Sequence, residues 1–81
     1  MRLDKFLKVS RIIKRRTVAN DACDTERISV NGRVVKASYS VKVGDVIEVT
    51  FGQRTLKVRV TEVKEVVDKN SASLLYEVLE Q

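Results

Sequence analysis

Apolar residues in the first part of the chain recur at the spacing of a helix. Five positions follow the i, i+3, i+4, i+7 and i+10 pattern of one helix face. They are Leu3, Phe6, Leu7, Ser10 and Ile13. The pattern predicts an amphipathic helix whose opposite face is cationic. That face would carry Arg2, Lys5, Lys8, Arg11 and Arg15. Because Val9 and Ile12 lie off the apolar stripe, the helix is expected to end near residue 10.

A second helix is expected to start at Thr17. Its hydroxyl can accept a hydrogen bond from a free backbone N–H of the first turn. One face of this helix would be apolar and would carry Val18, Ala19, Ala22 and Cys23. Asn20, Asp21 and Asp24 would lie outside. Cys23 is interpreted as a small buried residue.

Strands are predicted for most of the remaining chain. Asn31-Gly32 favours a type I′ hairpin turn, because both central positions need a positive φ. Residues 42–45 form a second turn, after an extended connection through Tyr39. In the following VIEVTF stretch, Ile47, Val49 and Phe51 would face inward. The next strand, RTLKVRVTEV, would follow a turn at residues 52–53.

The last part of the chain is less patterned. Residues 66–73 are polar and predict a loop or a short helical turn, and the final LLYEVLE stretch favours a strand. The predicted fold class is therefore α+β, with two N-terminal helices packed on a small antiparallel sheet. All 81 residues are expected to form a single domain.

Composition excludes several kinds of active site. The chain has no histidine and one cysteine, so it cannot supply zinc-ligand clusters or a Ser/His or Cys/His catalytic pair. No phosphate-binding loop, dinucleotide fingerprint or metal-ligand spacing is present. No apolar run approaches the roughly 18 residues that predict a membrane span. We therefore expect a cytoplasmic, non-catalytic protein without a cofactor or a membrane partner.

Positive charge is concentrated in the first half of the chain. Residues 1–36 carry ten Lys or Arg against four acids, a net +6, whereas residues 37–81 carry six against seven, a net −1. An excess in one half indicates a surface for a polyanion. Arginines at 11, 15 and 16 add planar guanidinium groups, which can donate two hydrogen bonds to the oxygens of one phosphate. The helix start beside them also favours an anion. The pattern predicts contact with nucleic acid.

Aromatic residues bear on the kind of nucleic acid. There are four, and Phe6 and Phe51 both fall on apolar faces and are expected in the core. A stacking platform for unpaired bases is then poorly supplied. This favours recognition of a folded nucleic acid through its backbone and shape.

Four motifs in order resemble the S-four RNA-binding domain, also called the αL motif. They are RLDKFL at 2–7, KRRTVA at 14–19, ISVNG at 28–32 and KVGD at 42–45. The resemblance covers about residues 1–51, which leaves a β extension over about 52–81. The chain is most similar to stand-alone members that act in ribosome-associated quality control, and less similar to the ribosome-associated heat-shock members. Two positions depart from the family: Glu26 replaces a left-handed glycine and Val43 replaces a proline.

This resemblance implies a function and partners. Such members bind large-subunit rRNA and P-site peptidyl-tRNA on an obstructed large ribosomal subunit. They act with an RqcH-like tailing factor that adds alanine to the stalled chain. We expect Arg2 and Arg16 to be the principal phosphate contacts, in a protein that is a monomer. The supporting RNA-binding residues would be Lys5, Lys8, Arg11, Lys14, Arg15 and Thr17.

Three alternatives stay open at this point. The chain could be the RNA-recruiting subunit of an rRNA-modifying enzyme, a general ribosome-associated heat-shock-type protein, or a basic DNA-associated protein. Lys57 and Arg59 could extend the RNA surface from an outer strand face, although a solvated strand face is the simpler interpretation.

Overall fold

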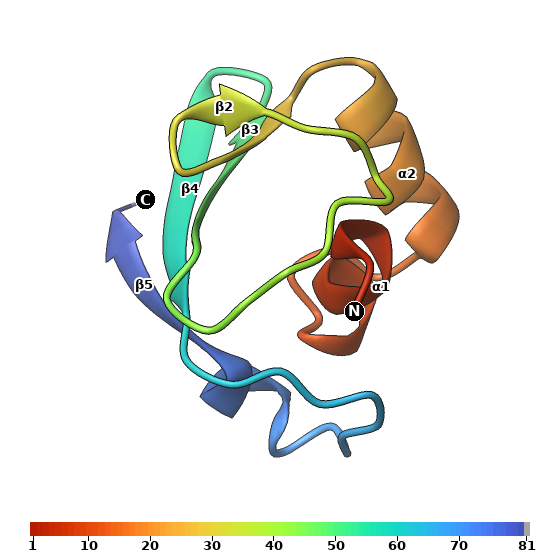
Figure 1. Cartoon of the computed structure of the whole chain (residues 1–81), viewed down its shortest axis with the longest axis vertical. Coiled ribbons are helices and arrows are strands. Elements are labelled where there is room, and N and C mark those ends of the chain that lie inside the picture. Colours follow the sequence, from red (N-terminus) through yellow and green to blue (C-terminus); the bar gives the residue numbers. More distant parts are fainter. Residues whose placement is uncertain (81) are drawn as a thin grey trace.

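Two helices cover one face of a five-stranded sheet (Figure 1). The computed structural model describes residues 1–80. The helices are α1 (Leu3–Val9), α2 (Arg16–Asp24) and the 3-10 helix η1 (Ala72–Leu75). The strands are β1 (Ile28–Val30), β2 (Arg33–Val34), β3 (Val46–Phe51), β4 (Arg54–Val60) and β5 (Tyr76–Glu80). The predicted α+β class is confirmed, and α1 ends where Val9 leaves the apolar stripe.

The sheet is antiparallel throughout, with strand order β2-β1-β3-β4-β5. The β1–β2 turn has positive φ at Asn31 (53°) and Gly32 (82°), as a type I′ turn requires. Glu26 has a φ of 60° after the end of α2. The chain thus keeps a left-handed residue there although it lacks the glycine, at a cost of about 1 kcal/mol.

The core lies between α1 and the sheet. Leu3, Phe6 and Leu7 are fully buried and belong to one apolar cluster with inward residues of β3 and β4 such as Ile47 and Val58. Burying each of these side chains contributes roughly 1.5–3 kcal/mol, so α1 is anchored firmly. Cys23 is buried, as expected.

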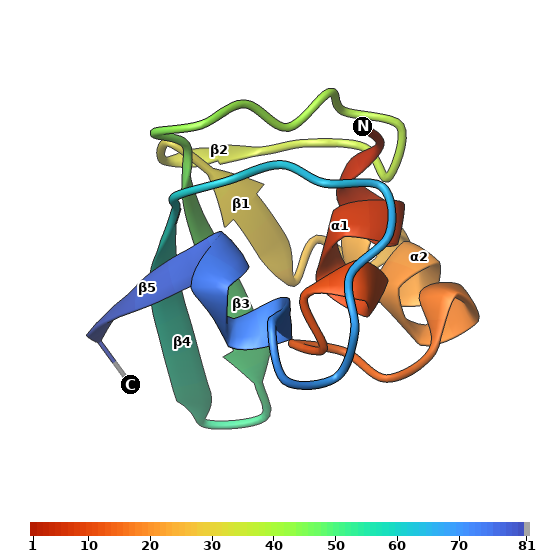
Figure 2. The ribbon, with the colours of Figure 1, turned by 90° about the horizontal axis from the view of Figure 1, so that it is seen from below.

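Two residues that the sequence places in the core are exposed instead. Val18 is 49% exposed and Phe51 is 46% exposed. Val18 borders an open hollow between α2 and the end of β3. Phe51 is the last residue of β3, where the β3–β4 hairpin extends beyond the cover of the helices (Figure 2). The predicted inward-facing positions of β3 are confirmed for Ile47 and Val49, which are buried, but the prediction is wrong for Phe51 at the strand end.

The long connection between β2 and β3 closes the other end of the core. Asp45 is buried there and accepts hydrogen bonds from Tyr39 Oη (2.9 Å), Asn31 Nδ2 (3.0 Å) and the Lys42 backbone N–H (2.9 Å). Burial would raise the pKa of Asp45, but these hydrogen bonds together lower it below its ordinary value. The carboxylate thereby ties the connection to the β1–β2 turn.

The segment from Thr61 to Ser71 leads from β4 past α1 to η1 (Figure 2). It has no regular structure, and β5 then returns along β4. The last stretch is thus part 3-10 helix and part strand, so the predicted strand is confirmed only from Tyr76 onward. Within residues 1–80, no helix is long and apolar enough to cross a membrane.

Candidate nucleic-acid interface

A buried carboxylate lies at the centre of the cationic surface. Asp4 is 2% exposed and accepts hydrogen bonds from Arg2 Nε (3.1 Å) and Arg2 Nη2 (3.3 Å). Asn20 Nδ2 donates to it at 3.3 Å, and the backbone N–H of Lys5 donates at 2.8 Å. Arg16 Nε lies 3.5 Å from its Oδ2 atom. One carboxylate therefore gathers groups from the chain start, α1 and α2.

Asp4 is charged at neutral pH. Burial would raise its pKa, but the donors on Arg2, Asn20, Arg16 and the Lys5 backbone together hold the pKa below its ordinary value. Each guanidinium has five N–H donors, and each arginine side chain is about half exposed, Arg2 at 50% and Arg16 at 47%. Both arginines keep donors for a second acceptor in solvent. Asp4 thus holds Arg2 and Arg16 together, and the two side chains can still bind a second anion.

The backbone around Arg2 is held in place by the β2–β3 connection. Arg2 forms an isolated antiparallel bridge with Ser40. Leu3 N–H donates to the Tyr39 carbonyl at 2.8 Å, and Val41 N–H donates to the Met1 carbonyl at 2.9 Å. Arg2 is thus the extended residue before α1, rather than part of the helix face that the periodicity predicts.

The loop from residue 10 to residue 15 carries more of the positive charge. Arg11 has a φ of 63°, so the helix stops and its outer face is not continued to Arg11 or Arg15, contrary to the prediction. The loop is closed by Ile13 N–H, which donates to the Leu7 carbonyl at 3.0 Å. Lys8, Arg11 and Lys14 border one hollow of about 310 Å³. Three cations around one hollow can hold a phosphate.

The start of α2 differs from the prediction. The helix begins at Arg16 with Arg15 as its N-cap residue, and no side chain caps it. Thr17 lies one residue inside the helix, exposed, so the predicted cap is wrong. It borders a shallow hollow with Asp4, Arg16 and Asn20. The free N–H groups of this first turn lie at the positive end of the helix dipole, where an anion is favoured.

Lys5 is a predicted contact that an acid from a distant segment engages. Its Nζ atom pairs with Glu65 of the Thr61–Ser71 segment. Two cations on the outer strand face are also paired. Lys57 Nζ lies 3.9 Å from Glu48 Oε1, and Arg59 Nη1 lies 2.6 Å from Glu77 Oε1. These pairs favour the solvated strand face for Lys57 and Arg59.

Sequence reasoning missed Asp4 and Asn20 as parts of this surface. From the sequence, Asp4 is only a part of the RLDKFL motif. A signal existed, since Asp4 stands three residues before Leu7 and so lies beside the apolar stripe. The sequence predicts Asn20 on the exposed face of α2, but it is half-buried and donates a hydrogen bond to Asp4. Among residues 1–80, no cluster of His, Cys, Asp or Glu could hold a metal ion.

Comparison with known proteins identifies the family of this chain. The S4 domain family model matches residues 1–47. The "RQC P-site tRNA stabilizing factor" of Halalkalibacterium halodurans is 59% identical over 78 residues, covering 96% of this chain and 89% of that protein. The protein of the same name in Bacillus subtilis is 52% identical over 81 residues, covering 100% of this chain and 94% of that protein.

More distant relatives share the fold. The "Heat shock protein 15 homolog" of Aeromonas salmonicida is 38% identical, covering 95% of this chain and 59% of that protein. The trimeric structure of Vibrio cholerae Heat Shock Protein 15 superposes with a TM-score of 0.89 at 26% identity, over 96% of this chain and 80% of that chain. The solution structure of the hypothetical protein HP1423 superposes with a TM-score of 0.83 at 29% identity, over 100% of this chain and 99% of that chain. The chain therefore belongs to the S4 domain family and, within it, to the family of the RQC P-site tRNA stabilizing factors.

Proposed function

We propose that this protein is a non-catalytic RNA-binding factor of ribosome-associated quality control in the cytoplasm. It binds large-subunit rRNA and P-site tRNA on obstructed large subunits. By holding the tRNA, it supports the addition of alanine to the stalled chain by an RqcH-like factor. The names of its relatives support the coarse part of this proposal.

The observation that carries the proposal is the Arg2–Asp4–Arg16 cluster. Two arginines that are distant in sequence share one buried carboxylate, so their free donors lie on one surface. Such a pair suits the backbone of a folded RNA, where phosphate contacts position the protein without reading bases. The hollow bordered by Lys8, Arg11 and Lys14 supplies further phosphate contacts, and Arg15 and Thr17 extend the surface at the start of α2.

Cosedimentation with purified ribosomal particles tests the binding step. The wild-type protein is expected to pellet with large subunits that carry peptidyl-tRNA, and binding should weaken as salt rises. Arg16→Ala or Arg2→Ala removes one charged phosphate contact, so each should weaken binding by roughly 10- to 100-fold. Each should also reduce the salt slope by about 1. Arg33→Ala is the matched control, because Arg33 is an exposed arginine on β2.

Two controls make this result decisive. Melting curves followed by circular dichroism show whether each variant stays folded. Arg16→Lys keeps the charge but loses the planar fork, so its binding should be intermediate. Wild-type cosedimentation by folded Arg2→Ala and Arg16→Ala variants would refute the assignment of these contacts.

A reconstituted tailing reaction tests the finer step. With obstructed large subunits, alanyl-tRNA and an RqcH-like factor, wild-type protein should increase alanine incorporation and Arg16→Ala should not. Equal tailing with and without the protein would rule out this role and leave only particle binding. Light scattering during size exclusion tests the proposed monomer, since the Vibrio cholerae Heat Shock Protein 15 structure is trimeric.

A further inference from the structure

Phe51 is an exposed aromatic residue in a chain that has only four aromatics. It ends β3, and across the hairpin its strand partner is Arg54. The ring borders two hollows, one toward α2 and one toward Arg54, Thr55 and Leu56. An aromatic side chain that is accessible from two sides can stack with a flat ligand.

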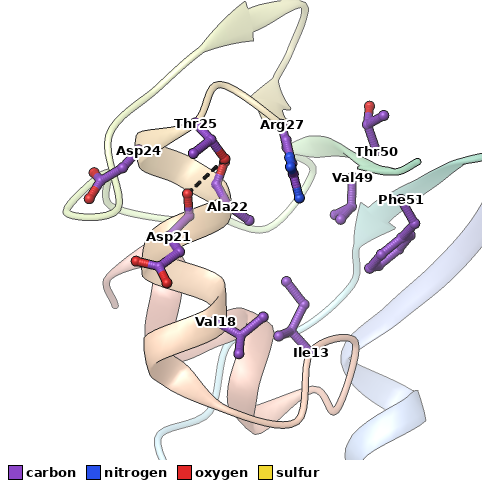
Figure 3. A pocket seen from close by; sticks show the side chains of 10 residues that line it. All are labelled: Ile13, Val18, Asp21, Ala22, Asp24, Thr25, Arg27, Val49, Thr50 and Phe51. Atoms are coloured by element: carbon purple, nitrogen blue, oxygen red, sulfur yellow. Dashed lines mark hydrogen bonds between the residues drawn. The ribbon is translucent and has the colours of Figure 1, made fainter. Parts of the chain in front are cut away.

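The hollow toward α2 is a groove of about 430 Å³ (Figure 3). Ile13 and Val18 project from the helical side toward the gap that Phe51 borders from the sheet (Figure 3). Val49 and Ala22 complete its apolar lining. Ile13 belongs to the loop of residues 10–15, which also carries Arg11 and Lys14 of the candidate nucleic-acid interface. The same loop therefore contributes to both the groove and that interface.

Two arginines flank Phe51. Arg27 is held beside the strand end because the Thr50 backbone N–H donates to its carbonyl at 2.9 Å, and its guanidinium points into the groove (Figure 3). Arg54 borders the second hollow together with Phe51. Within residues 1–80, neither guanidinium lies within 4.0 Å of an acid. Asp21 and Asp24 of α2 also line the groove, and their side chains lie on its far side from Phe51 (Figure 3).

We propose that this groove binds an unstacked nucleotide of the RNA that the cationic surface holds, an inference that rests on the proposed RNA binding. The base stacks on Phe51 above the apolar lining, and its flanking phosphates pair with Arg27 and Arg54. Aromatic stacking with neighbouring arginines is how proteins hold unpaired bases. A polyanion is repelled by Asp21 and Asp24, so the strand passes on the side of the two arginines. The partner is thus a folded RNA with a single-stranded nucleotide next to the gripped backbone.

Nuclear magnetic resonance with two small probes tests this inference at low salt. The first probe is a uridine pentanucleotide, and the second is a phosphodiester of equal length without bases. We expect the pentanucleotide to shift the ring signals of Phe51 and the methyl signals of Val18 and Val49. The abasic probe should bind more weakly and leave the ring signals unchanged. Phe51→Ala should weaken pentanucleotide binding by about 5- to 150-fold.

Matched variants separate stacking from general effects. Phe51→Leu keeps an apolar side chain without a π-face and should also weaken binding, whereas Val34→Ala, at another exposed apolar residue, should not. Arg27→Gln should weaken binding more than Arg33→Gln. Arg16→Ala should keep the pentanucleotide at Phe51 while losing large subunits, so failure of the main interface and failure of this groove give different results.

Three outcomes would overturn the inference. The abasic probe could bind as tightly as the pentanucleotide, which would mean that charge alone acts. The signal changes caused by the pentanucleotide could be confined to the surface around Arg2 and Arg16, which would mean that it does not bind in the groove. The Phe51 signals could instead move with protein concentration in the absence of RNA, which would assign the groove to a second copy of the chain.

Discussion

Replacing Asp4 by asparagine tests whether this carboxylate organises the RNA-binding surface. The substitution keeps the size of the side chain but removes its charge and one acceptor oxygen. In the structure, the carboxylate accepts two hydrogen bonds from Arg2, one from Asn20 and one from the Lys5 backbone, and it pairs with Arg16. Asparagine would place an NH₂ group against these donors.

The expected loss of stability follows from these contacts. Hydrogen bonds to a charged group contribute about 1.5–3 kcal/mol each, and breaking a fully buried pair costs about 3–5 kcal/mol. Asp4 is buried, but the two arginines are half exposed and regain water when the carboxylate is removed. We therefore expect the free energy of unfolding to fall by about 2 kcal/mol. For a domain of this size, that lowers Tm by roughly 8–16 °C.

The pH dependence has a definite sign. The pKa of Asp4 is lowered by folding, so its contribution is complete above the unfolded pKa of about 3.9. It is lost as the pH falls through the lower pKa of the folded state. The unfolding free energies of wild type and Asp4→Asn, measured by urea denaturation, should therefore differ by a constant amount from about pH 5 to about pH 8 and converge below about pH 4. The lowered pKa of Asp45 acts equally in both proteins and cancels.

Binding gives an independent readout, because Asp4→Asn raises the net charge from +5 to +6. More positive charge alone would strengthen binding to a polyanion. We expect binding to large subunits to weaken instead, since Arg2 and Arg16 lose their common anchor. Asp24→Asn is the matched control: it makes the same charge change at an exposed residue and should bind at least as well as wild type. Stronger binding by folded Asp4→Asn, or a stability difference that persists at low pH, would refute this reasoning.

Three further predictions concern single residues elsewhere. Glu26→Gly should stabilise the protein by about 0.5–1 kcal/mol in urea titrations, because Glu26 has a φ of 60°; a loss of stability would contradict the strain. Asp45→Ala should cost about 2–3 kcal/mol in the same assay, since Tyr39 Oη and Asn31 Nδ2 lose their buried acceptor, and an unchanged midpoint would show that the network is dispensable. Burial, with the nearby Asp4 and Asp24 charges, raises the pKa of the Cys23 thiol to about 11. A disulfide reagent at about pH 8 should therefore react far more slowly with the native protein than with the urea-unfolded protein. Equal rates would show that the thiol is accessible.

Local patterns in the sequence determined much of the architecture. The stripe of Leu3, Phe6 and Leu7 specified α1 and its buried face, because side chains three and four residues apart share one side of a helix. Asn31-Gly32 specified the hairpin, since few other pairs adopt positive φ at both turn positions. The excess of arginine and lysine in the first 36 residues pointed to a polyanion without any knowledge of the fold.

Which of these residues come into contact depends on long-range packing. Alternation shows that Phe51 shares a face with Val49, but the reach of the helices over the sheet decides that Val49 is buried and Phe51 is open. Helical periodicity likewise placed Arg11 on the outer face of α1, whereas the left-handed turn at Arg11 ends that face. The convergence of Arg2 and Arg16 on Asp4 needs the packing of α1 against α2, which no local pattern encodes. Local patterns thus specified most elements and the sign of the charge, and long-range packing arranged them into a surface.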